Sequence, residues 1–424
     1  MIALVVAIVV GQVPTEVPTW TEDIQTIMVS NCLPCHKSGG AGPFHLMSYD
    51  DVAGRASFIV ELTTSGIMPP WLPDESGVPI RHQRSISKEA IATIQKWIDA
   101  GKPKGDAPEI AICEGMPRIP VATGQTNPLT PWTIPAESQV RWHKGILDKQ
   151  TFVLPINNPE PLKVTSFVFK TTAARAVQMV GFVFDFQGRG RAFDGWDPDT
   201  PGYEMMGDIG WVPSGTHGKI GPGTGEISLP NGFHWEIPTN VDLIAETHYR
   251  PRGKEEKLSC YVSIQSDPTV NSRAVQEIVT MVRRIYIEAE DTAYSVGETI
   301  ELPVAVDVVG ITPRAGAECS SMKIASGDTT LFSISKWDPH YGETVFFEEP
   351  FRLESGASIT SNWKYNNSES NPRNPFVPAQ RIDLAQKTGV ANFILHVSPV
   401  NAENSETIRK WNLSLLRKRQ RATQ

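Results

Sequence analysis

The sequence contains little cysteine, no excess of positive charge and no apolar run long enough to cross a membrane. Its 424 residues include five cysteines and carry a formal net charge of −8 at pH 7. This negative charge argues against a nucleic-acid partner. The apolar stretch MIALVVAIVVG, residues 1–11, is shorter than the roughly 20 residues that a transmembrane helix needs. We therefore expect no nucleic-acid-binding function and no transmembrane span.

The same apolar stretch resembles the hydrophobic region of an export signal, although no basic residues precede it. We assign residues 1–18 to this signal-like segment. The sequence therefore predicts an exported protein, located in the periplasm or outside the cell.

The motif NCLPCH, residues 31–36, has the spacing of a covalent haem attachment site. In such a site Cys32 and Cys35 form thioether bonds to haem c, and His36 is the proximal ligand of the iron. The alternative is a zinc or redox C-x-x-C pair followed by a chance histidine. A zinc site usually has a second pair of cysteine or histidine ligands, and no second C-x-x-C occurs in the chain. We therefore predict haem c, which most bacteria attach outside the cytoplasm.

Met68, in the stretch SGIMPPW, is predicted to be the distal ligand of the haem iron. Pro69 and Pro70 stiffen the backbone beside it, as a loop that carries a thioether to iron requires. Ligation by histidine and methionine raises the reduction potential of a haem. A lone methionine also commonly packs in a core. Three other residues remain alternatives for this role: Met47, His45 and His82.

Two stretches around the motif predict helices. TEDIQTIMVSN, directly before it, places Ile24, Ile27 and Met28 at helical spacing. SKEAIATIQKWIDAG begins with the capping residue Ser87 and has apolar residues along one face. A polar, proline-rich linker, KPKGDAPE, follows. We assign residues 19–108 to a small all-α, cytochrome c-like haem domain.

From about residue 120 short β-rich runs, such as VTSFVFKT and MVGFVFDFQG, alternate with proline and glycine turns. No long amphipathic helix interrupts them, and SRAVQEIVTMVRR is compatible with either helix or strand. The pattern is typical of β-sandwiches, and about 300 residues is large for a single one. We expect two sandwiches, at residues 109–280 and 281–424, the second ending in a short, solvated basic tail.

Several motifs of this region resemble those of a known enzyme family. DIGWVPSG and GEISLPNGFHWEIPTNVDLIAETHYRPRGK are similar to the copper type II, ascorbate-dependent monooxygenases, the peptidylglycine α-hydroxylating and dopamine β-monooxygenase-like family. SKWD and YNNSESNPRNP follow in that family's order. GGAGPF, SYDDV and MPPW match its bacterial relatives that contain haem c. The resemblance covers nearly the whole chain and implies two jelly-roll-like sandwiches, each holding one copper, with a solvated cleft between them.

The predicted fold class is therefore multidomain: a small all-α cytochrome c domain followed by two all-β jelly-roll-like sandwiches.

The resemblance also implies six copper ligands, of which this chain keeps only His248 in ETHYRP. Gln178 and Met179 stand at the family's adjacent His-His pair. Arg314 and Gly316 replace its His-x-His pair, and QKTGVANFIL lacks its methionine. Because a guanidinium is always charged and only donates hydrogen bonds, Arg314 would repel a copper ion. We therefore expect haem c as the cofactor and no copper.

Other histidines could form a rebuilt copper site, although a surface or hydrogen-bonded histidine is the simpler interpretation of each. The four in this region are His217, His234, His340 and His396. His234 and His248 are the pair to check, because they lie in adjacent strand-like runs. Outside the haem motif the cysteines are Cys113, Cys260 and Cys319, an odd number that leaves at least one without an internal partner.

These observations predict an exported c-type cytochrome that passes electrons to a redox partner protein. Its monooxygenase-like β module would have lost copper and catalysis. Two alternatives are a copper-dependent monooxygenase that uses the haem as its electron inlet, and a haem-containing binding or sensory protein. The enzyme reading rests on a resemblance of fold, which does not carry function by itself. No motif indicates an oligomeric state.

Overall fold

The computed structural model describes most of the chain. The described residues are 17–70, 72–110, 126–128, 132–134, 148–186, 188–196, 198–203, 218–221, 225–267, 271–282, 285–374, 376–383 and 391–421. Residues 1–16 of the signal-like segment, Cys113 and His217 lie outside them.

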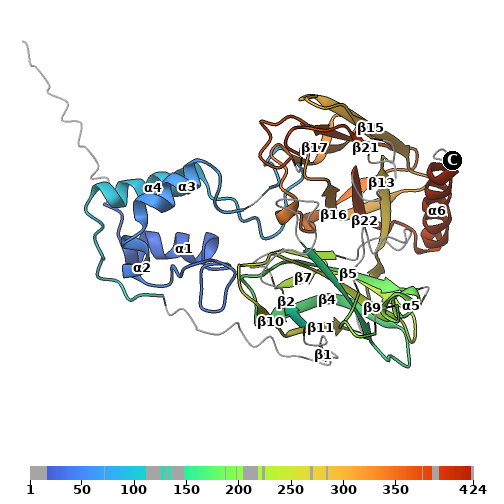
Figure 1. The fold of residues 1–424 in the computed structure, drawn as a ribbon, viewed down its shortest axis with the longest axis horizontal. Coiled ribbons are helices and arrows are strands. Elements are labelled where there is room, and N and C mark those ends of the chain that lie inside the picture. The colour runs from blue at the N-terminus through green and yellow to red at the C-terminus, as the bar shows by residue number, and fades with distance from the viewer. Residues whose placement is uncertain are drawn as a thin grey trace, which may run out of the picture.

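The N-terminal part contains four short α-helices that follow a π-helical turn, η1 (Figure 1). Their bounds are η1 (Trp20–Ile24), α1 (Gln25–Asn31), α2 (Tyr49–Ala53), α3 (Ala56–Thr64) and α4 (Lys88–Asp99). The Ser87 hydroxyl accepts a hydrogen bond from the Ala90 N–H at 3.1 Å. This cap satisfies a backbone donor that the first turn leaves free, so α4 begins where the sequence places a serine. The helices meet around Trp97, which is fully buried.

The first β-sandwich has a six-stranded and a four-stranded sheet. The larger sheet has the order β1-β11-β4-β8-β12 with β7 paired to β4, and the smaller has the order β3-β9-β5-β6. The bounds are β1 (Thr126–Pro128), β3 (Asp148–Pro155), β4 (Leu162–Thr171), β5 (Val177–Asp185), β6 (Gly218–Ile220), β7 (Glu226–Ser228), β8 (Phe233–Ile237), β9 (Asp242–Tyr249), β11 (Cys260–Ser266) and β12 (Arg273–Ala274). Phe167 of β4 stacks on Phe182 of β5, with ring centroids 5.1 Å apart, so the two sheets share one core.

Three smaller elements accompany the first sandwich. They are a two-stranded pair, β2 (Trp132–Ile134) with β10 (Glu256–Leu258), and the short helix α5 (Arg189–Asp194).

The second β-sandwich consists of two four-stranded sheets with the orders β13-β22-β16-β19 and β15-β20-β17-β18. The bounds are β13 (Gln276–Met281), β15 (Tyr294–Glu301), β16 (Val306–Ala315), β17 (Cys319–Ser326), β18 (Thr329–Ile334), β19 (Val345–Leu353), β20 (Ser358–Tyr365) and β22 (Ala391–Pro399), with β14 (Tyr286–Ile287) paired to β21 (Ile382–Asp383). Trp363 and Phe393 stack across the two sheets with centroids 5.2 Å apart. Within SRAVQEIVTMVRR, the described residues 272–282 thus contain strands β12 and β13 rather than a helix.

The two sandwiches pack against each other through buried contacts. The ring centroids of Trp235 and Phe346 lie 6.3 Å apart, and Phe346 joins the core of the first sandwich. Arg273 of β12 donates to the Asp307 carboxylate of β16 at 2.6 Å. The Lys219 N–H donates to Thr344 Oγ1 at 2.8 Å. These contacts fix the relative position of the strands that border the cleft described below.

The predicted fold class is wrong in its N-terminal part, because the described residues contain no small all-α domain. The protein is mainly β, with sandwich-like sheets, and its six described α-helices span only 5 to 17 residues.

Between α3 and α4, residues 74–81 leave the helices and pack on the second sandwich. Ile80 pairs with Phe347 and is buried in the core of that sandwich. The Asp74 carboxylate accepts a hydrogen bond from Ser333 Oγ at 2.8 Å. The chain between α3 and α4 is therefore part of the second sandwich, so the N-terminal helices do not form a domain separate from the β-sheets.

The C-terminal tail also differs from its prediction as a solvated end. It forms helix α6 (Ser405–Arg421), next to β13 in Figure 1. Ile408 is fully buried, and the Asn412 side chain bonds the backbone of β13 at Glu277 and Val279. One face of the basic tail thus covers the sheet. Among the described residues, none of the helices combines the length and the apolar character needed to cross a bilayer.

Candidate functional site

The motif NCLPCH forms a tight turn directly after α1. Cys32 caps the helix, and its N–H donates to the Met28 carbonyl at 2.9 Å. The N–H groups of Cys35 and His36 both donate to the Cys32 carbonyl, at 3.2 and 2.9 Å. One turn of backbone therefore holds the two thiols and the imidazole on the same short segment.

The His36 ring is fixed by a hydrogen bond to the backbone. Its Nδ1 donates to the Phe44 carbonyl at 2.9 Å, so Nε2 is the unprotonated nitrogen of the neutral ring. Burial lowers the pKa of His36, and this favours the neutral form. A Cβ at Gly42 would lie 2.7 Å from His36 Nδ1, so the close approach of this loop requires glycine. A fixed Nδ1–H and a free Nε2 are what an axial imidazole ligand needs.

A cavity of about 350 Å³ lies against this turn; we call it the motif cavity. Both thiols, His36 and Met68 line it, so the structure brings the four predicted haem-binding residues together. Much of the remaining wall is apolar and includes Phe58, Ile59, Leu62 and Ile86. Its volume falls within the range of about 300–1,000 Å³ typical of small-molecule and cofactor sites.

The three alternatives to Met68 do not line the motif cavity. Met47 packs at the edge of the helical cluster, and its sulfur accepts a hydrogen bond from the Ser38 N–H at 3.3 Å. His45 and His82 are exposed. Met68 itself follows α3, where its N–H donates to the Leu62 carbonyl at 3.1 Å. Among the four candidates, the geometry thus favours Met68.

The two motif thiols do not have the electrostatics of a redox pair. Burial raises the pKa of Cys32 to about 12, and the neighbouring Cys35 adds to this effect. Burial also raises the pKa of Cys35. Reactive C-x-x-C pairs depend on a lowered thiol pKa. The described residues contain no group of three or more His, Cys, Asp or Glu side chains placed to hold a metal ion.

Side chains of the β-sandwiches complete the motif cavity on one side. Gln178 of β5 and Tyr341 of the 3₁₀ turn η2 (Pro339–Tyr341) both line it. Arg84 lines it as well and forms an ion pair with Glu343. The motif cavity therefore lies where the N-terminal helices meet both sandwiches.

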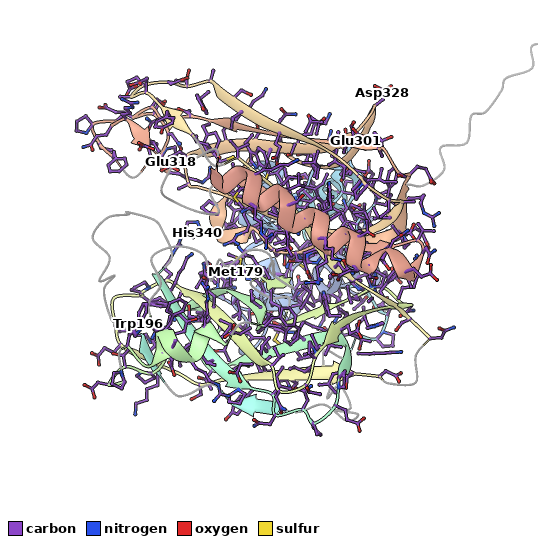
Figure 2. All side chains as sticks on the ribbon, turned by 90° about the vertical axis from the view of Figure 1, so that its right-hand side faces the viewer. Met179, Trp196, Glu301, Glu318, Asp328 and His340 are labelled. Atoms are coloured by element: carbon purple, nitrogen blue, oxygen red, sulfur yellow. The ribbon has the colours of Figure 1, made fainter. Side chains whose placement is uncertain are left out.

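A second cavity, of about 170 Å³, lies between the two sandwiches; we call it the cleft. Three cationic side chains and two histidines line it together with apolar residues. The polar members are Lys149, Lys219, Arg314, His248 and His340, and the apolar members include Met179, Pro313, Trp337 and Pro339. Figure 2 shows Met179 and His340 between the two sandwiches.

His248 belongs to a buried ionic cluster. It lies on β9, paired with Met179 of β5 and Lys149 of β3, and its Nε2 donates to Glu246 Oε1 at 2.5 Å. Burial lowers the pKa of His248 to about 4, although Glu246 opposes the shift. Burial alone would raise the pKa of Glu246, but the charge of Lys149 and the hydrogen bond from His248 hold it well below its usual range. At neutral pH His248 is therefore uncharged and bound to a carboxylate.

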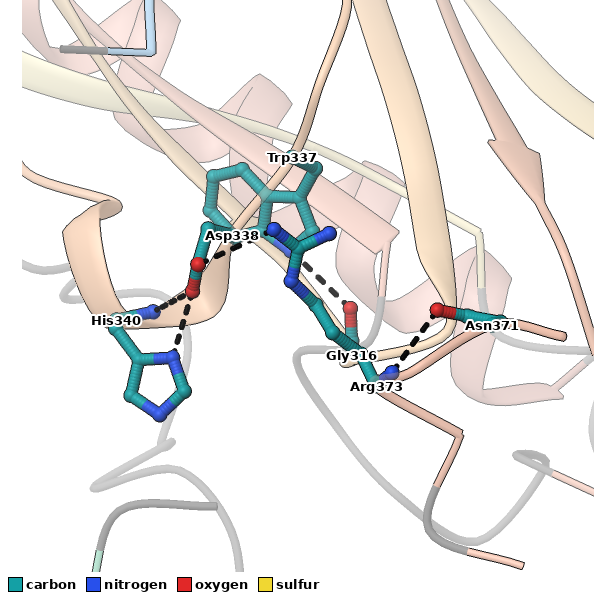
Figure 3. A network of polar contacts seen from close by, with 6 residues as sticks. All are labelled: Gly316, Trp337, Asp338, His340, Asn371 and Arg373. Atoms are coloured by element: carbon teal, nitrogen blue, oxygen red, sulfur yellow. Dashed lines mark hydrogen bonds and ion pairs between the residues drawn. The ribbon is translucent and has the colours of Figure 1, made fainter. Parts of the chain in front are cut away.

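His340, on the 3₁₀ turn η2, also lines the cleft, and Figure 3 shows its contacts with Asp338. Asp338 accepts hydrogen bonds from its N–H at 3.0 Å and its Nδ1 at 2.6 Å, and one from Arg373 at 3.2 Å. Burial would raise the pKa of Asp338, but these partners lower it to about 2. His340 Nε2 is buried and has no hydrogen-bond partner within the described part of the chain. This nitrogen is therefore available to a molecule in the cleft.

The remaining predicted histidines do not form a site with His248. His234 lies on β8, in the other sheet of the first sandwich, where its Nδ1 bonds Ser272 Oγ at 2.7 Å. His396 is fully buried on β22, with its Nε2 bonded to Thr312 Oγ1 at 2.8 Å. The proposed pair of His234 and His248 is thus separated by the sandwich core. Cys260 and Cys319 are free thiols buried in different sandwiches.

A backbone irregularity separates Gln178 from Met179, the two residues that stand where the copper monooxygenases have their adjacent His-His pair. The register of β5 against β9 shifts between Val177 and Met179, so Gln178 is the extra residue. Gln178 lines the motif cavity, whereas Met179 lines the cleft. The sequence contains no signal for this bulge. Arg314 and Gly316, at the family's His-x-His position, both line the cleft.

No family model matches this chain, and no curated protein matches it. Among solved structures, one of PNGF-II, in space group P21, is similar with a TM-score of 0.32 and 11% sequence identity; the match covers 64% of this chain and 65% of that chain. A structure of the infectious bursal disease virus Gx strain has a TM-score of 0.10 and 8% identity, covering 67% and 83% of the two chains. Likenesses this weak carry no functional argument.

The buried His396 should make the protein sensitive to moderate acid. Burial lowers its pKa to about 3, so between pH 6.5 and 3 the unfolded state binds a proton that the folded state does not. The contribution of neutral His396 to the free energy of unfolding is fully present above pH 6.5. As the pH falls below 6.5, this free energy decreases by about 1.4 kcal/mol per pH unit. We expect His396→Gln to gain about 2 kcal/mol of unfolding free energy relative to wild type between pH 6.5 and pH 5.

Urea unfolding of both proteins at the two pH values measures this difference. Glu277, whose pKa burial raises to about 8, acts in the opposite direction but cancels in the comparison. His82→Gln, at an exposed position, is the control and should show no such change. An equal pH dependence of His396→Gln and wild type would contradict the assignment.

Proposed function

We propose that this chain is an exported electron-transfer protein that carries one covalently attached haem c. The observation that carries the proposal is the motif cavity, in which Cys32, Cys35, His36 and Met68 line one largely apolar space. In this proposal Cys32 and Cys35 hold the haem through thioether bonds. His36 and Met68 would bind its iron.

The local chemistry supports this ligand set. The hydrogen bond from His36 Nδ1 to the Phe44 carbonyl fixes the ring and leaves Nε2 for the iron. The raised pKa of Cys32 keeps its thiol protonated, which disfavours a reactive redox pair. Apolar side chains such as Ile59 and Leu62 exclude water from the site.

When bound, a haem of this kind supplies reversible one-electron transfer. Gln178 and Tyr341 cover the side of the motif cavity that faces the sandwiches. Phe58, which also lines the cavity, is 47% exposed on the helical side. A redox partner protein would therefore approach the haem from the helical side. Export remains part of the proposal and rests on the signal-like segment and on the site of haem c attachment.

We further propose that the β module is a copper-free scaffold related to the monooxygenases that the sequence resembles. Lys149, Lys219 and Arg314 line the cleft, and their positive charges oppose binding of a metal cation. His248 already donates its Nε2 proton to Glu246. The single family ligand that the chain retains is thus already bonded to a carboxylate and stands without the family's other five ligands.

Metal analysis of the purified full-length protein tests this function. The protein must come from a host that attaches haem c. We expect one iron and no copper per chain. Two copper ions per chain would instead support the copper-dependent monooxygenase.

Copper titration tests the scaffold proposal separately. Because copper binds weakly to many exposed histidines, the test must be specific to the site. We expect no copper site tighter than the micromolar range, roughly −8 kcal/mol, whose affinity falls in His248→Ala. His45→Ala, at an exposed histidine, is the control for adventitious binding. Tight copper in the wild type that is lost in His248→Ala would show that the scaffold proposal is wrong.

A further inference from the structure

Helix α6 forms one end of the molecule. In Figure 1 it lies at the opposite end of the long axis from the N-terminal helices, and in Figure 2 it crosses the face that is turned toward the viewer. Its inner face packs on the second sandwich through Ile408, Trp411 and Leu415. The Asn412 side chain adds a hydrogen bond to β13 at 2.9 Å. The outer face of the helix is therefore turned to the surroundings.

The helix and the residues after it concentrate positive charge in an otherwise acidic protein. Residues 405–424 include six Lys or Arg residues and one Glu, a formal charge of +5. Because the whole chain carries −8, the residues before 405 carry −13. Four of the basic side chains are exposed in the structure: Arg409, Lys410, Arg417 and Lys418. A local charge opposite to that of the rest of the protein indicates a surface for a negatively charged partner.

Ion pairs within the helix and the helix dipole account for only part of this charge. Glu406 accepts from Arg409 at 2.6 Å and lies 3.6 Å from Lys410. Neither Arg417 nor Lys418 forms an ion pair within the described part of the chain. The helix dipole favours cations in the last turn only, so it does not explain the basic residues of the second turn. One carboxylate thus serves a surface with four exposed cations.

Helical spacing places two of these cations on one outward strip. Lys410 and Arg417 are seven residues apart, which is about two turns or 10.5 Å along the axis. Ile408 and Leu415 have the same spacing on the inner face. Leu413 lies between the two cations on the outward side and is half-buried. Because a helix surface is convex, this strip fits a flat charged surface better than a protein that would need an anchoring pocket.

We propose that the outer face of α6 binds an anionic lipid bilayer. Basic helices with an amphipathic pattern commonly lie on membrane surfaces. Each Lys or Arg near an anionic surface strengthens binding roughly fivefold, or by about 1 kcal/mol. Lys410 and Arg417 contact the lipid headgroups, Arg409 and Lys418 flank them, and Leu413 reaches the boundary of the acyl chains. The inference does not depend on the haem, so its failure would leave the haem proposal untouched.

Sedimentation of the purified full-length protein with lipid vesicles tests the proposal. One set of vesicles contains equal parts of phosphatidylglycerol and phosphatidylcholine, and the other contains phosphatidylcholine alone. We expect stronger binding to the anionic vesicles. Between about 0.1 and 1 M salt the Debye length falls from about 10 to about 3 Å, so this binding should weaken by on the order of tenfold or more. The absence of binding to anionic vesicles would overturn the proposal. Binding to a soluble polyglutamate peptide but not to vesicles would instead identify an acidic protein as the partner.

Paired variants locate the binding surface. Lys410→Gln with Arg417→Gln removes two charges of the strip and should weaken binding to anionic vesicles about 25-fold. Lys88→Gln with Lys96→Gln removes two exposed charges of α4, at the other end of the molecule, and should bind like wild type. Both double variants have the same net charge, so net charge alone cannot produce a difference between them. Circular dichroism reports folding, and Lys418→Gln, with an expected fivefold loss, replaces the first variant if it does not fold. Equal affinities of the α6 and α4 variants would place the bilayer elsewhere and contradict the proposal.

Discussion

Replacing both Cys32 and Cys35 by alanine is expected to abolish covalent haem attachment. The two thiols line the motif cavity, and the Cys32–His36 turn places them on one short segment beside His36. Among the four cysteines of the described chain, they are the only pair that lies next to a cavity of cofactor size; Cys260 and Cys319 are buried in separate cores. Each single variant should keep at most one thioether bond.

Haem staining of denaturing gels and the haemochrome spectrum in alkaline pyridine measure the attachment. Cys260→Ala is the matched control, because it removes a buried thiol far from the motif and should retain the haem. The double variant should show no stain and no covalent haem after acid extraction. A double variant that keeps its full haem content would contradict the assignment of these two residues.

Met68→Ala is expected to remove the thioether ligand of the haem iron. Met68 lines the motif cavity together with His36, whereas Met47 does not. The variant should lose the weak far-red charge-transfer band of the oxidised protein. Its reduction potential should fall by on the order of 100 mV or more, since axial ligands set haem potentials over a range of about 0.8 V.

Absorption spectroscopy and redox titration of Met68→Ala, Met68→His and Met47→Ala separate the candidates. Met68→His supplies a nitrogen ligand and should also lower the potential while keeping the iron six-coordinate. Met47→Ala should behave like wild type, because Met47 packs at the edge of the helical cluster. A band that survives in Met68→Ala and disappears in Met47→Ala would show that Met47 is the ligand.

The local structure of the helices could be predicted from the sequence, but their place in the fold could not. Ser87 caps α4, as the sequence indicates, and Ile24 and Met28 lie on the helical turn before the motif. The association of residues 74–81 with the second sandwich depends on partners such as Ser333, more than 200 residues away. The spacing of apolar residues along the sequence indicates local helix or strand, but it carries no information on such a long-range contact. The prediction of a separate all-α domain was therefore wrong.

Two further features were missed for different physical reasons. In α6 the signal was present, because Ile408, Trp411 and Leu415 recur at helical spacing, but the basic residues around them suggested a solvated tail. The division of Gln178 and Met179 between two cavities had no signal, because it results from a bulge in β5. The cationic wall of the cleft likewise combines residues of three strands from both sandwiches.

The mass of the denatured full-length protein, purified from a host that attaches haem c, tests the central claim most directly. Denaturation removes any haem that is held only by its axial ligands, so only thioether-linked haem remains on the chain. We predict the mass of the mature polypeptide plus one haem, with the added mass on the peptide that contains Cys32 and Cys35. A mass equal to that of the polypeptide alone, from a host that modifies other haem c proteins, would contradict the account.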